Sequence, residues 1–260
     1  MYLPRQKDRH IAITGASSGI GEAIARRLAA EGARVSLLAR RVEALGAVAA
    51  SIEAAGGVAA GFRCDVVEAA SVDSAFAAAV ARFGPVHAVV ASSGVGGPNA
   101  AGAGDRFDTI VQTNLYGTYH TLRAAERSLA EGPGRRDIVV IASILARFGV
   151  PGYTAYCASK AALLGLVKVS ALELAGANVQ VNAVCPGWVE TDMAWEGIDG
   201  MAAGMGVSRQ EALEVAMRAV PLGRMGKPHE VAGLVAFLLS EDAAGVTGQT
   251  LDQNGGAWMG

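Results

Sequence analysis

Tyr156 and Lys160 stand four residues apart, and their side chains form the pair in this sequence best suited to proton transfer. Within a helix, residues with this spacing lie on the same face, so the phenol and the ammonium would project into one site. A free tyrosine titrates at about pH 10, but a neighbouring cation favours the phenolate and lowers its pKa. The pair predicts a proton donor with a cation beside it, although this spacing alone also occurs by chance in many helices.

Ser143 lies upstream of this pair, directly after the apolar run at residues 137–142. The β-branched residues of that run are typical of a buried parallel strand. A hydroxyl at the end of such a strand could hold a carbonyl oxygen while Tyr156 protonates it.

A glycine loop, Thr-Gly-Ala-Ser-Ser-Gly-Ile-Gly at residues 14–21, follows a short apolar strand at residues 11–13 and precedes an amphipathic helix that ends near Gly32. Glycines let a backbone approach a pyrophosphate closely, and a helix N-terminus offers unpaired N–H groups to its charge. The spacing Gly-x-x-x-Gly-x-Gly differs from the commoner Gly-x-Gly-x-x-Gly pattern. The strand and helix on either side favour a nucleotide site over a purely structural turn.

The end of the second predicted strand, residues 34–39, indicates which nucleotide is bound. An NAD site usually places an acid there to bind the ribose 2′-hydroxyl, but this chain has Ala39, Arg40 and Arg41. Guanidinium groups suit a 2′-phosphate instead. NADP(H) is therefore favoured, NAD(H) stays possible, and two solvated arginines at a helix start are the alternative.

Composition limits the function classes. The chain has 260 residues, 52% of them hydrophobic and 18% charged, with a formal net charge of −2. The sequence lacks a lysine-arginine stripe, so nucleic-acid binding is not predicted. No apolar stretch is expected to reach a membrane-spanning length or to form a signal peptide, so a cytoplasmic location is expected. The three cysteines and four histidines are scattered, which predicts reduced thiols and no metal site.

Strand and helix patterns alternate along the whole chain without linkers or repeats. This alternation predicts an α/β fold, a single doubly wound Rossmann domain over residues 1–260 with a parallel sheet of about seven strands flanked by helices. Further strands are expected at residues 58–63, 86–90, 179–184 and 246–252, and further helices at 42–55, 72–83, from about 105, and at 228–239. The methionine-rich segment at about residues 190–220 is predicted to be a substrate lid, with an ordinary helical insertion as the alternative.

The glycine loop, Asn114, Ser143, Tyr156 and Lys160, in this order, resemble the short-chain dehydrogenase/reductase family. The resemblance covers the chain from Ile11 to about Gly256. It is closest to ketoreductases, both those acting on 3-oxoacyl thioesters and those of aromatic polyketide synthesis.

This resemblance implies roles for the matching residues. Tyr156 would be the general acid in reduction, and Ser143 would orient the carbonyl oxygen. Lys160 would bind the nicotinamide ribose and tune Tyr156, while Asn114 would support a water relay to Lys160. The residues expected to bind the cofactor are Gly15, Ser17, Ser18, Gly19, Ile20, Gly21, Arg40, Arg41, Asp65, Val66, Ser93, Gly94, Tyr156, Lys160, Pro186, Gly187, Val189 and Thr191. A homo-tetramer is expected, with a dimer as the alternative.

The predicted function is NADP(H)-dependent reduction of a ketone to a secondary alcohol, or the reverse. An apolar cyclic, aromatic or polyketide or 3-oxoacyl-like substrate is expected, and Arg147 could meet a phosphate or carboxylate on it. The expected pocket residues are Val95, Ser143, Ile144, Phe148, Tyr153, Trp188, Met193 and Trp195. The alternatives are an NAD-dependent secondary alcohol dehydrogenase and a non-catalytic nucleotide-binding regulator, which would not need the complete catalytic set.

Two departures from the family pattern stand out. Residues 91–94 read Ala-Ser-Ser-Gly where the family usually has Asn-Asn-Ala-Gly, so the asparagine amides are missing and only serine hydroxyls remain. Residues 251–256 read Leu-Asp-Gln-Asn-Gly-Gly where relatives commonly have a shorter Asp-Gly-Gly turn. Neither departure changes the proposed proton-transfer residues.

Overall fold

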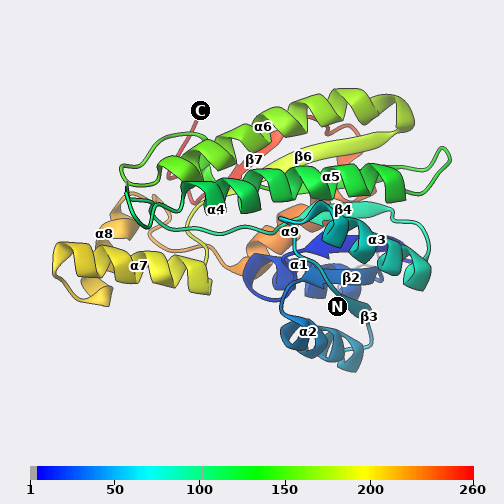
Figure 1. The fold of residues 1–260 in the computed structure, drawn as a ribbon, viewed down its shortest axis with the longest axis horizontal. Helices are drawn as coiled ribbons and strands as arrows, with labels where there is room; N and C mark the ends of the chain where they lie inside the picture. Colours follow the sequence, from blue (N-terminus) through cyan, green and yellow to red (C-terminus); the bar gives the residue numbers. More distant parts are fainter. Residues whose placement is uncertain (1–4, 101) are drawn as a thin grey trace.

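Seven parallel strands form one twisted sheet in the order β3-β2-β1-β4-β5-β6-β7 (Figure 1). The structure is a computed structural model that describes residues 5–100 and 102–260. The strands are β1 (His10–Thr14), β2 (Arg34–Ala39), β3 (Val58–Arg63), β4 (Ala88–Ala91), β5 (Arg136–Ile141), β6 (Val179–Pro186) and β7 (Thr250–Gln253). The predicted doubly wound fold with a seven-stranded parallel sheet is confirmed.

Helices cover both faces of the sheet, because the central strands β1, β4 and β5 are buried on both sides. One face is packed by α1, α2 and α9, and the other by α3, α5 and α6. These helices are α1 (Gly19–Ala30), α2 (Val42–Ala54), α3 (Ala69–Phe83), α5 (Gly117–Ser128), α6 (Thr154–Leu174) and α9 (Pro228–Leu238). Two separate apolar clusters, one on each face, therefore hold the carboxyl ends of the strands in fixed positions.

Strand β1 pairs with β2 on one side and with β4 on the other. The chain thus runs outward from β1 in both directions, and the loops that follow β1 and β4 turn to opposite faces of the sheet. In open α/β sheets a ligand binds in the crevice at this switch point, beyond the carboxyl ends of the strands. The glycine loop follows β1, so the topology places it at that crevice.

The last strand is shorter than expected. It was predicted over residues 246–252, but β7 covers Thr250–Gln253. Two features keep residues 246–249 out of the ladder: Gly248 has a left-handed φ of 69°, and the side chain of Asn182 bonds the carbonyl of Val246 and the N–H of Gln249. The segment still runs beside β6, since the Gly248 N–H donates to the Val181 carbonyl and the Gln249 carbonyl accepts from the Ala183 N–H. The Asn182 amide takes the place of a backbone partner only at the Val246 carbonyl and the Gln249 N–H.

The helix expected from about residue 105 begins instead at Phe107, after Asp105 accepts a hydrogen bond from the Phe107 N–H. It starts as α4 (Phe107–Val111), widens into the π-helix η1 (Gln112–Tyr116), and continues as α5. Sequence periodicity did not predict this widening, which is typical of functional sites.

Two other boundaries differ from expectation. Helix α3 begins at Ala69 rather than at Val72. Strand β4 begins at Ala88 rather than at Val86, since Val86 makes only an isolated bridge to Leu129.

Helix α6 continues through a short 3-10 turn, so the helical segment Thr154–Ala177 is long and apolar enough to span a membrane by length and composition. The expectation that no stretch approaches that length was wrong. Its mean hydropathy is 1.3, and 39% of the apolar window is buried inside the molecule. Because α6 packs one face on the sheet through Leu163 and Val167 and carries a buried lysine, Lys160, it is a core helix of this fold, although Val169 and Leu172 on its outer face are exposed.

The predicted lid segment folds as a hairpin of two helices, α7 (Asp192–Met205) and α8 (Arg209–Arg218), which stands apart from the sheet in Figure 1. We call α7 and α8 the lid hairpin, after the prediction that they cover the substrate, which stays a prediction. It has an apolar cluster of its own, and a capping box joins Ser208 and Glu211 at the start of α8. Its two ends are tied where Val189 bridges Gly226 and Lys227 binds Glu190.

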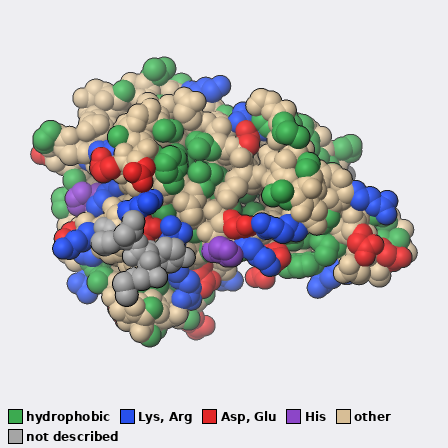
Figure 2. All heavy atoms as spheres, turned by 180° about the vertical axis from the view of Figure 1, so that it is seen from behind, with side chains coloured by type: hydrophobic (Ala, Val, Ile, Leu, Met, Phe, Trp, Pro, Cys, Tyr) green, Lys and Arg blue, Asp and Glu red, His purple; other side chains and the backbone are tan. Residues whose placement is uncertain are grey.

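Positive and negative side chains are interspersed on the face shown in Figure 2. This distribution agrees with the small net charge of −2. On that face no single-sign stripe of the kind that tracks a nucleic-acid backbone is visible.

His10 is a fully buried titratable group at the start of β1. Its Nδ1 lies 2.7 Å from the carbonyl oxygen of Gly84, so Nδ1 donates, and its Nε2 lies 2.8 Å from the Ser36 hydroxyl, which donates to it. Burial lowers the pKa of His10 below its ordinary value. The imidazole is therefore held neutral in the folded protein.

This arrangement predicts a loss of stability in mild acid. Below the ordinary histidine pKa of about 6.5 the unfolded chain binds a proton that folded His10 does not, so falling pH favours unfolding. We expect wild type to lose more free energy of unfolding than His10→Gln when urea titrations are compared at about pH 7.5 and about pH 5.5. Equal losses in the two proteins would contradict the assignment.

Candidate active site

Ser143 is placed by the end of β5. Its backbone is extended, and it caps the short 3-10 turn η2 (Ile144–Ala146) by accepting a hydrogen bond from the Leu145 N–H at 3.1 Å. The residue is 7% exposed, so its hydroxyl stands at a nearly buried position beyond the strand. The strand and the cap together fix the hydroxyl in space.

Tyr156 and Lys160 project from the first turns of α6, which packs against the η2 turn. The Lys160 ammonium is 5% exposed, donates a hydrogen bond to the carbonyl of Ile141 at 2.9 Å, and lies 5.8 Å from the centre of the Tyr156 ring. The structure therefore brings Ser143, Tyr156 and Lys160 to one place, as the sequence predicted.

The pKa of Tyr156 lies above its ordinary value, because burial penalises the phenolate, and a hydrogen bond with Ser143 acts in the opposite direction. The expectation that this pKa is lowered is wrong for the protein alone, because burial outweighs the groups that would lower it. Tyr156 therefore keeps its proton at neutral pH, which is the form that can donate to a carbonyl.

Burial lowers the pKa of Lys160 from 10.5 to about 8. The side chain is therefore still mostly charged at neutral pH but holds its proton less tightly than a free lysine. A buried ammonium with one backbone acceptor is costly, which is typical of a functional rather than a stabilising residue.

Asn114 lies in the π-helix η1 and is fully buried. Its side chain accepts from the Val95 N–H at 2.8 Å and donates to the Val95 carbonyl at 3.0 Å and to the Ser159 hydroxyl at 3.1 Å. The amide thus joins the loop after β4 to the catalytic helix α6, and a carbon added at Gly94 would lie within 3.4 Å of both Asn114 and Lys160.

The Ala-Ser-Ser-Gly segment after β4 is braced from β1. The hydroxyl of Thr14 accepts from the backbone N–H groups of Ser92 and Ser93, at 3.2 and 3.4 Å. Thr14 and Asn114 therefore hold this loop from two sides, without the asparagine amides of the usual family pattern. The sequence analysis did not single out Thr14, although its place directly before Gly15 was the available signal.

Asn99 is a second residue that the sequence analysis missed. Its side-chain carbonyl accepts from the Ala155 N–H at 2.9 Å, and its own N–H donates to the carbonyl of Gly152 at 2.8 Å. The N-cap residue of helix α6, Tyr153, makes no side-chain capping bond. Asn99, on the loop after β4, instead supplies an acceptor for a backbone N–H of the first turn. No local sequence pattern indicates a cap that comes from so far along the chain.

The glycine loop has the shape of a phosphate cradle. Gly15 and Gly19 have left-handed φ values of 69° and 59°, and a carbon added at Gly21 would lie 2.3 Å from the Gly15 carbonyl oxygen. Only glycine fits this close turn, which leaves the N-terminus of α1 open to an anion. These residues fit the pyrophosphate of a dinucleotide.

The two arginines after β2 differ in their contacts. The Arg41 guanidinium donates to the hydroxyls of Ser17 at 3.1 Å and Ser18 at 2.7 Å, while Arg40 is exposed. A cation and two hydroxyls thus meet beside the glycine loop, which suits a 2′-phosphate. Arg41 is exposed as well, so the 2′-phosphate site stays a prediction and two solvated arginines stay its alternative.

Asp65 and Val66 follow β3 at the same edge of the sheet. One Asp65 carboxylate oxygen accepts from the Val67 N–H at 3.2 Å, so this side chain caps a local turn. Val66 is buried and contacts the position of Gly117 on α5. A contact of either residue with adenine stays a prediction.

Among the expected cofactor residues, the family resemblance implies that Pro186, Gly187 and Thr191 contact the nicotinamide, and they lie at the end of β6 or just after it. Gly187 packs so closely on Asn254 that an added carbon would lie 2.9 Å from its Cα. Val189 is buried, and Thr191 caps α7 while its methyl group lies 3.3 Å from where a carbon on Gly19 would stand. The base of the lid hairpin therefore already touches the glycine loop.

The predicted pocket residues divide into two groups. Trp188 and Trp195 pack against the apolar cluster of the lid hairpin, and Arg209 lies 5.6 Å from the centre of the Trp195 ring. Met193 is 43% exposed, and its sulfur would lie 2.8 Å from a carbon on Gly96, so it approaches the loop after β4. The remaining members lie on the loops after β4 and β5 or at the start of α6: Val95, Ser143, Ile144, Phe148 and Tyr153.

Arg147 does not offer a free guanidinium to a substrate. It forms an ion pair with Asp252, donates to the carbonyl of Thr250 and stacks on the ring of Trp258. The expectation that it could meet a phosphate or carboxylate is not supported by these contacts, since its Nε and Nη2 donors are bound to Asp252 and Thr250 and its charge is paired.

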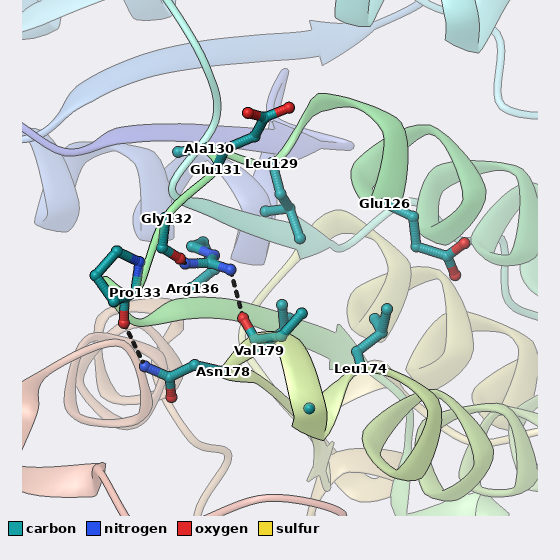
Figure 3. A pocket seen from close by; sticks show the side chains of 12 residues that line it. Glu126, Leu129, Ala130, Glu131, Gly132, Pro133, Arg136, Leu174, Asn178 and Val179 are labelled. Atoms are coloured by element: carbon teal, nitrogen blue, oxygen red, sulfur yellow. Dashed lines mark hydrogen bonds between the residues drawn. The ribbon is translucent and has the colours of Figure 1, made fainter.

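A cavity of about 450 Å³ lies at the opposite end of the sheet, where β5 and β6 begin (Figure 3). Arg136 stands in it, but its guanidinium donates to the carbonyls of Gly132, Gly134 and Ala177. This cavity contains none of the predicted site residues. The two terminal nitrogens of its cation are bound by backbone carbonyls, and only the buried Nε lacks a partner among the described residues. The chemistry belongs to the carboxyl ends of the strands.

Comparisons with known proteins agree with this geometry. The family whose profile matches residues 15–257 is described as enoyl-(acyl carrier protein) reductase. A Streptomyces coelicolor protein named a ketoacyl reductase is 40% identical over 249 residues, which cover 94% of this chain and 95% of the relative. The 3-oxoacyl-(acyl-carrier-protein) reductase FabG of Escherichia coli is 35% identical over 249 residues, with 95% and 96% covered.

Among solved structures, an actinorhodin polyketide ketoreductase variant crystallised with NADPH superposes with a TM-score of 0.89 at 38% identity, covering 99% of each chain. The chain belongs to the short-chain dehydrogenase/reductase family. The resemblance predicted from the glycine loop and from Asn114, Ser143, Tyr156 and Lys160 is therefore confirmed, as is the expectation of a reductase in this family.

Membership of this family makes the glycine loop a testable cofactor cradle. In Gly21→Ala the new methyl group would collide with the Gly15 carbonyl, so the loop must shift, and we expect NADPH affinity to fall by about tenfold or more in a fluorescence titration. Gly46→Ala is the matched control, because Gly46 lies within α2 with nothing inside 4 Å. It should keep NADPH affinity and gain helix stability. Unchanged affinity in Gly21→Ala would refute the cradle.

Lys160 gives a second prediction for this reductase. Its pKa shift from 10.5 to about 8 corresponds to a cost of about 3 kcal/mol, which exceeds the value of its one hydrogen bond. The folded protein binds this proton more weakly than the unfolded chain, so the cost is complete below about pH 8 and fades as pH rises towards about 10.5. We expect Lys160→Met to unfold at higher urea than wild type at neutral pH, with a smaller gain at about pH 10.

The exposed Lys168 on the same helix provides the control for this measurement. Lys168→Met should show little change in urea stability at either pH, since an exposed lysine has no such cost. A Lys160→Met protein that is less stable than wild type at neutral pH would contradict the assignment.

Proposed function

We propose that this protein is an NADP(H)-dependent reductase that converts a ketone to a secondary alcohol, or catalyses the reverse reaction. The observation that carries the proposal is the placement of the Tyr156 phenol against the Ser143 hydroxyl and beside the buried ammonium of Lys160. A proton donor, a second hydroxyl and a cation are what carbonyl reduction requires of the protein.

In this mechanism the hydroxyls of Ser143 and Tyr156 both donate to the ketone oxygen and hold it in place. Bound NADPH would supply the hydride. Tyr156 transfers its phenolic proton to the oxygen as negative charge develops there, and Lys160 stabilises the resulting phenolate. Asn114 would support the water relay that returns a proton to this site through Lys160.

NADP(H) is proposed as the cofactor because Arg41, Ser17 and Ser18 form a cationic, hydroxyl-lined corner beside the glycine loop, with Arg40 next to it. A solved relative contains NADPH. An acid at the end of β2 would favour NAD(H), but the residues there are Ala39, Arg40 and Arg41. NAD-dependent oxidation of a secondary alcohol is the alternative that this corner disfavours.

The substrate is proposed to be apolar and cyclic, aromatic, polyketide-like or 3-oxoacyl-like. Two observations support this class. The side chains expected around Tyr156 are apolar or aromatic, including the exposed Phe148 and Met193. Relatives similar over nearly the whole chain are named for ketoacyl and polyketide reduction.

A homo-tetramer is proposed as the assembly, with a dimer as the alternative. The outer surfaces of α5, α6 and the π-helix carry exposed apolar side chains that a subunit contact would cover. They include Tyr116, Tyr119, Val169 and Leu172. A cytoplasmic location is part of the same proposal, and the three free cysteines fit a reducing compartment.

The experiment that tests this function follows NADPH absorbance with a panel of 3-oxoacyl thioesters, cyclic diketones and aryl ketones, with NADH in parallel. An enoyl thioester is included because the matching family profile carries that description. Turnover of one ketone class with NADPH alone would support the proposal. Turnover with NADH alone, with the enoyl thioester alone, or with nothing in either direction would overturn it.

Tyr156→Phe gives the sharpest prediction about mechanism. The variant keeps the ring and loses only the proton donor, so we expect kcat to fall by about a hundredfold or more while NADPH still binds. Steady-state kinetics and an NADPH titration measure the two effects separately. Full turnover by the purified variant would refute the proton-donor role.

A further inference from the structure

The end of the Ser143 turn is tied to the last strand by one arginine. Arg147 follows the η2 turn, and its N–H donates to the carbonyl of Ile144. Its guanidinium forms a fork on Asp252, with Nε to Oδ1 at 3.1 Å and Nη2 to Oδ2 at 2.8 Å. Two parallel bonds fix both the distance and the plane of the pair, which a single contact would not do.

The other side of the same guanidinium is covered by an aromatic ring. Arg147 lies 4.9 Å from the centre of the Trp258 ring, and its Nη2 also reaches the carbonyl of Thr250 at 3.3 Å. We call Arg147, Asp252 and Trp258 the C-terminal clamp. The ion pair is about four-fifths buried on each side, so it is less screened than a surface pair.

Asn254 orders the segment between the two partners of Arg147. Its side chain accepts from the Gly256 N–H at 3.0 Å and donates to the Trp258 carbonyl at 3.2 Å. It is 8% exposed, so this turn is a built structure rather than a free tail. Trp258 is thereby presented to Arg147 at a fixed position.

The same short segment touches two other parts of the active site. Asn254 packs on Gly187 at the end of β6, and the Gly187 N–H donates to the Gln253 carbonyl. Gly255 accepts from the Leu222 N–H at 3.0 Å, where the chain returns from the lid hairpin. The segment 252–258 therefore contacts the Ser143 turn, the proposed nicotinamide loop and the base of the lid hairpin.

We propose that Arg147 is a positioning residue for carbonyl reduction, which holds the Ser143 hydroxyl in register with Tyr156 by clamping the η2 turn to Asp252 and Trp258. The inference rests on the proposed function and adds to it a residue that does not touch the reacting atoms. Arg147 acts through the turn, because only three residues separate it from Ser143 and both ends of the turn are hydrogen-bonded. A misplacement of about 1 Å in a reacting group can cost about a hundredfold in rate.

The test compares Arg147→Met, Asp252→Asn and the double variant with wild type, using the ketone that wild type reduces. Each single change should lower kcat by about tenfold, with NADPH affinity unchanged, since the clamp acts on Ser143 and not on the cofactor corner. The double variant should be no slower than the slower single variant, because both changes remove the same contact. Arg147→Lys should recover only part of the rate, since an ammonium cannot form the fork.

The control is Arg127→Met, which breaks an arginine-aspartate pair between α5 and Asp73, far along the chain from the η2 turn. It should leave kcat unchanged. Hydrogen exchange of residues 143–149 gives a second readout that does not need turnover, and the clamp variants should exchange faster there while the control does not. Failure of wild type with every ketone would reject the proposed function alone. Unchanged exchange in this segment, or unchanged kcat in Arg147→Met, would overturn the clamp.

Discussion

The hydrogen bond from the Lys160 ammonium to the Ile141 carbonyl is the interaction around which the site is arranged. It joins the catalytic helix α6 to the end of β5, where the strand leads into Ser143. A buried ammonium with one backbone acceptor is unfavourable for folding, so the packing of α6 on the sheet must hold it there. The buried position of the Lys160 ammonium has a functional reason, because it puts a cation beside Tyr156 within a mostly buried site.

Parallel strands then bring the other groups to this point. The carboxyl ends of β1, β4, β5 and β6 all lie at one edge of the sheet, so the glycine loop, the Ser-Ser-Gly loop, Ser143 and the Pro-Gly loop become neighbours although they are far apart in the chain. Side chains link these loops directly. Thr14 binds the loop after β4 from β1, and Asn114 binds it from the π-helix. The serines that replace the usual asparagines therefore stand in a loop that is held through its backbone.

The open side of the site is bounded by two later segments. The lid hairpin reaches the glycine loop through Thr191 and the loop after β4 through Met193. The C-terminal turn around Asn254 reaches Ser143's turn, the β6 loop and the base of the hairpin. The C-terminal turn accepts from the Leu222 N–H, where the chain returns from the hairpin, so the two segments are in direct contact.

The sequence alone determined the fold class, the family and the four residues proposed for proton transfer, because each depends on local signals: apolar strand runs, glycines before a helix, and a tyrosine four residues before a lysine. Tertiary structure alone decided what those residues contact. The direction of the Tyr156 pKa, the π-helix at Asn114, the cap that Asn99 gives to α6 and the capture of Arg147 by Asp252 all depend on burial or on partners distant in the chain. Spacing shows which groups can meet on one helix face, but desolvation and long-range hydrogen bonds are properties of the packed molecule.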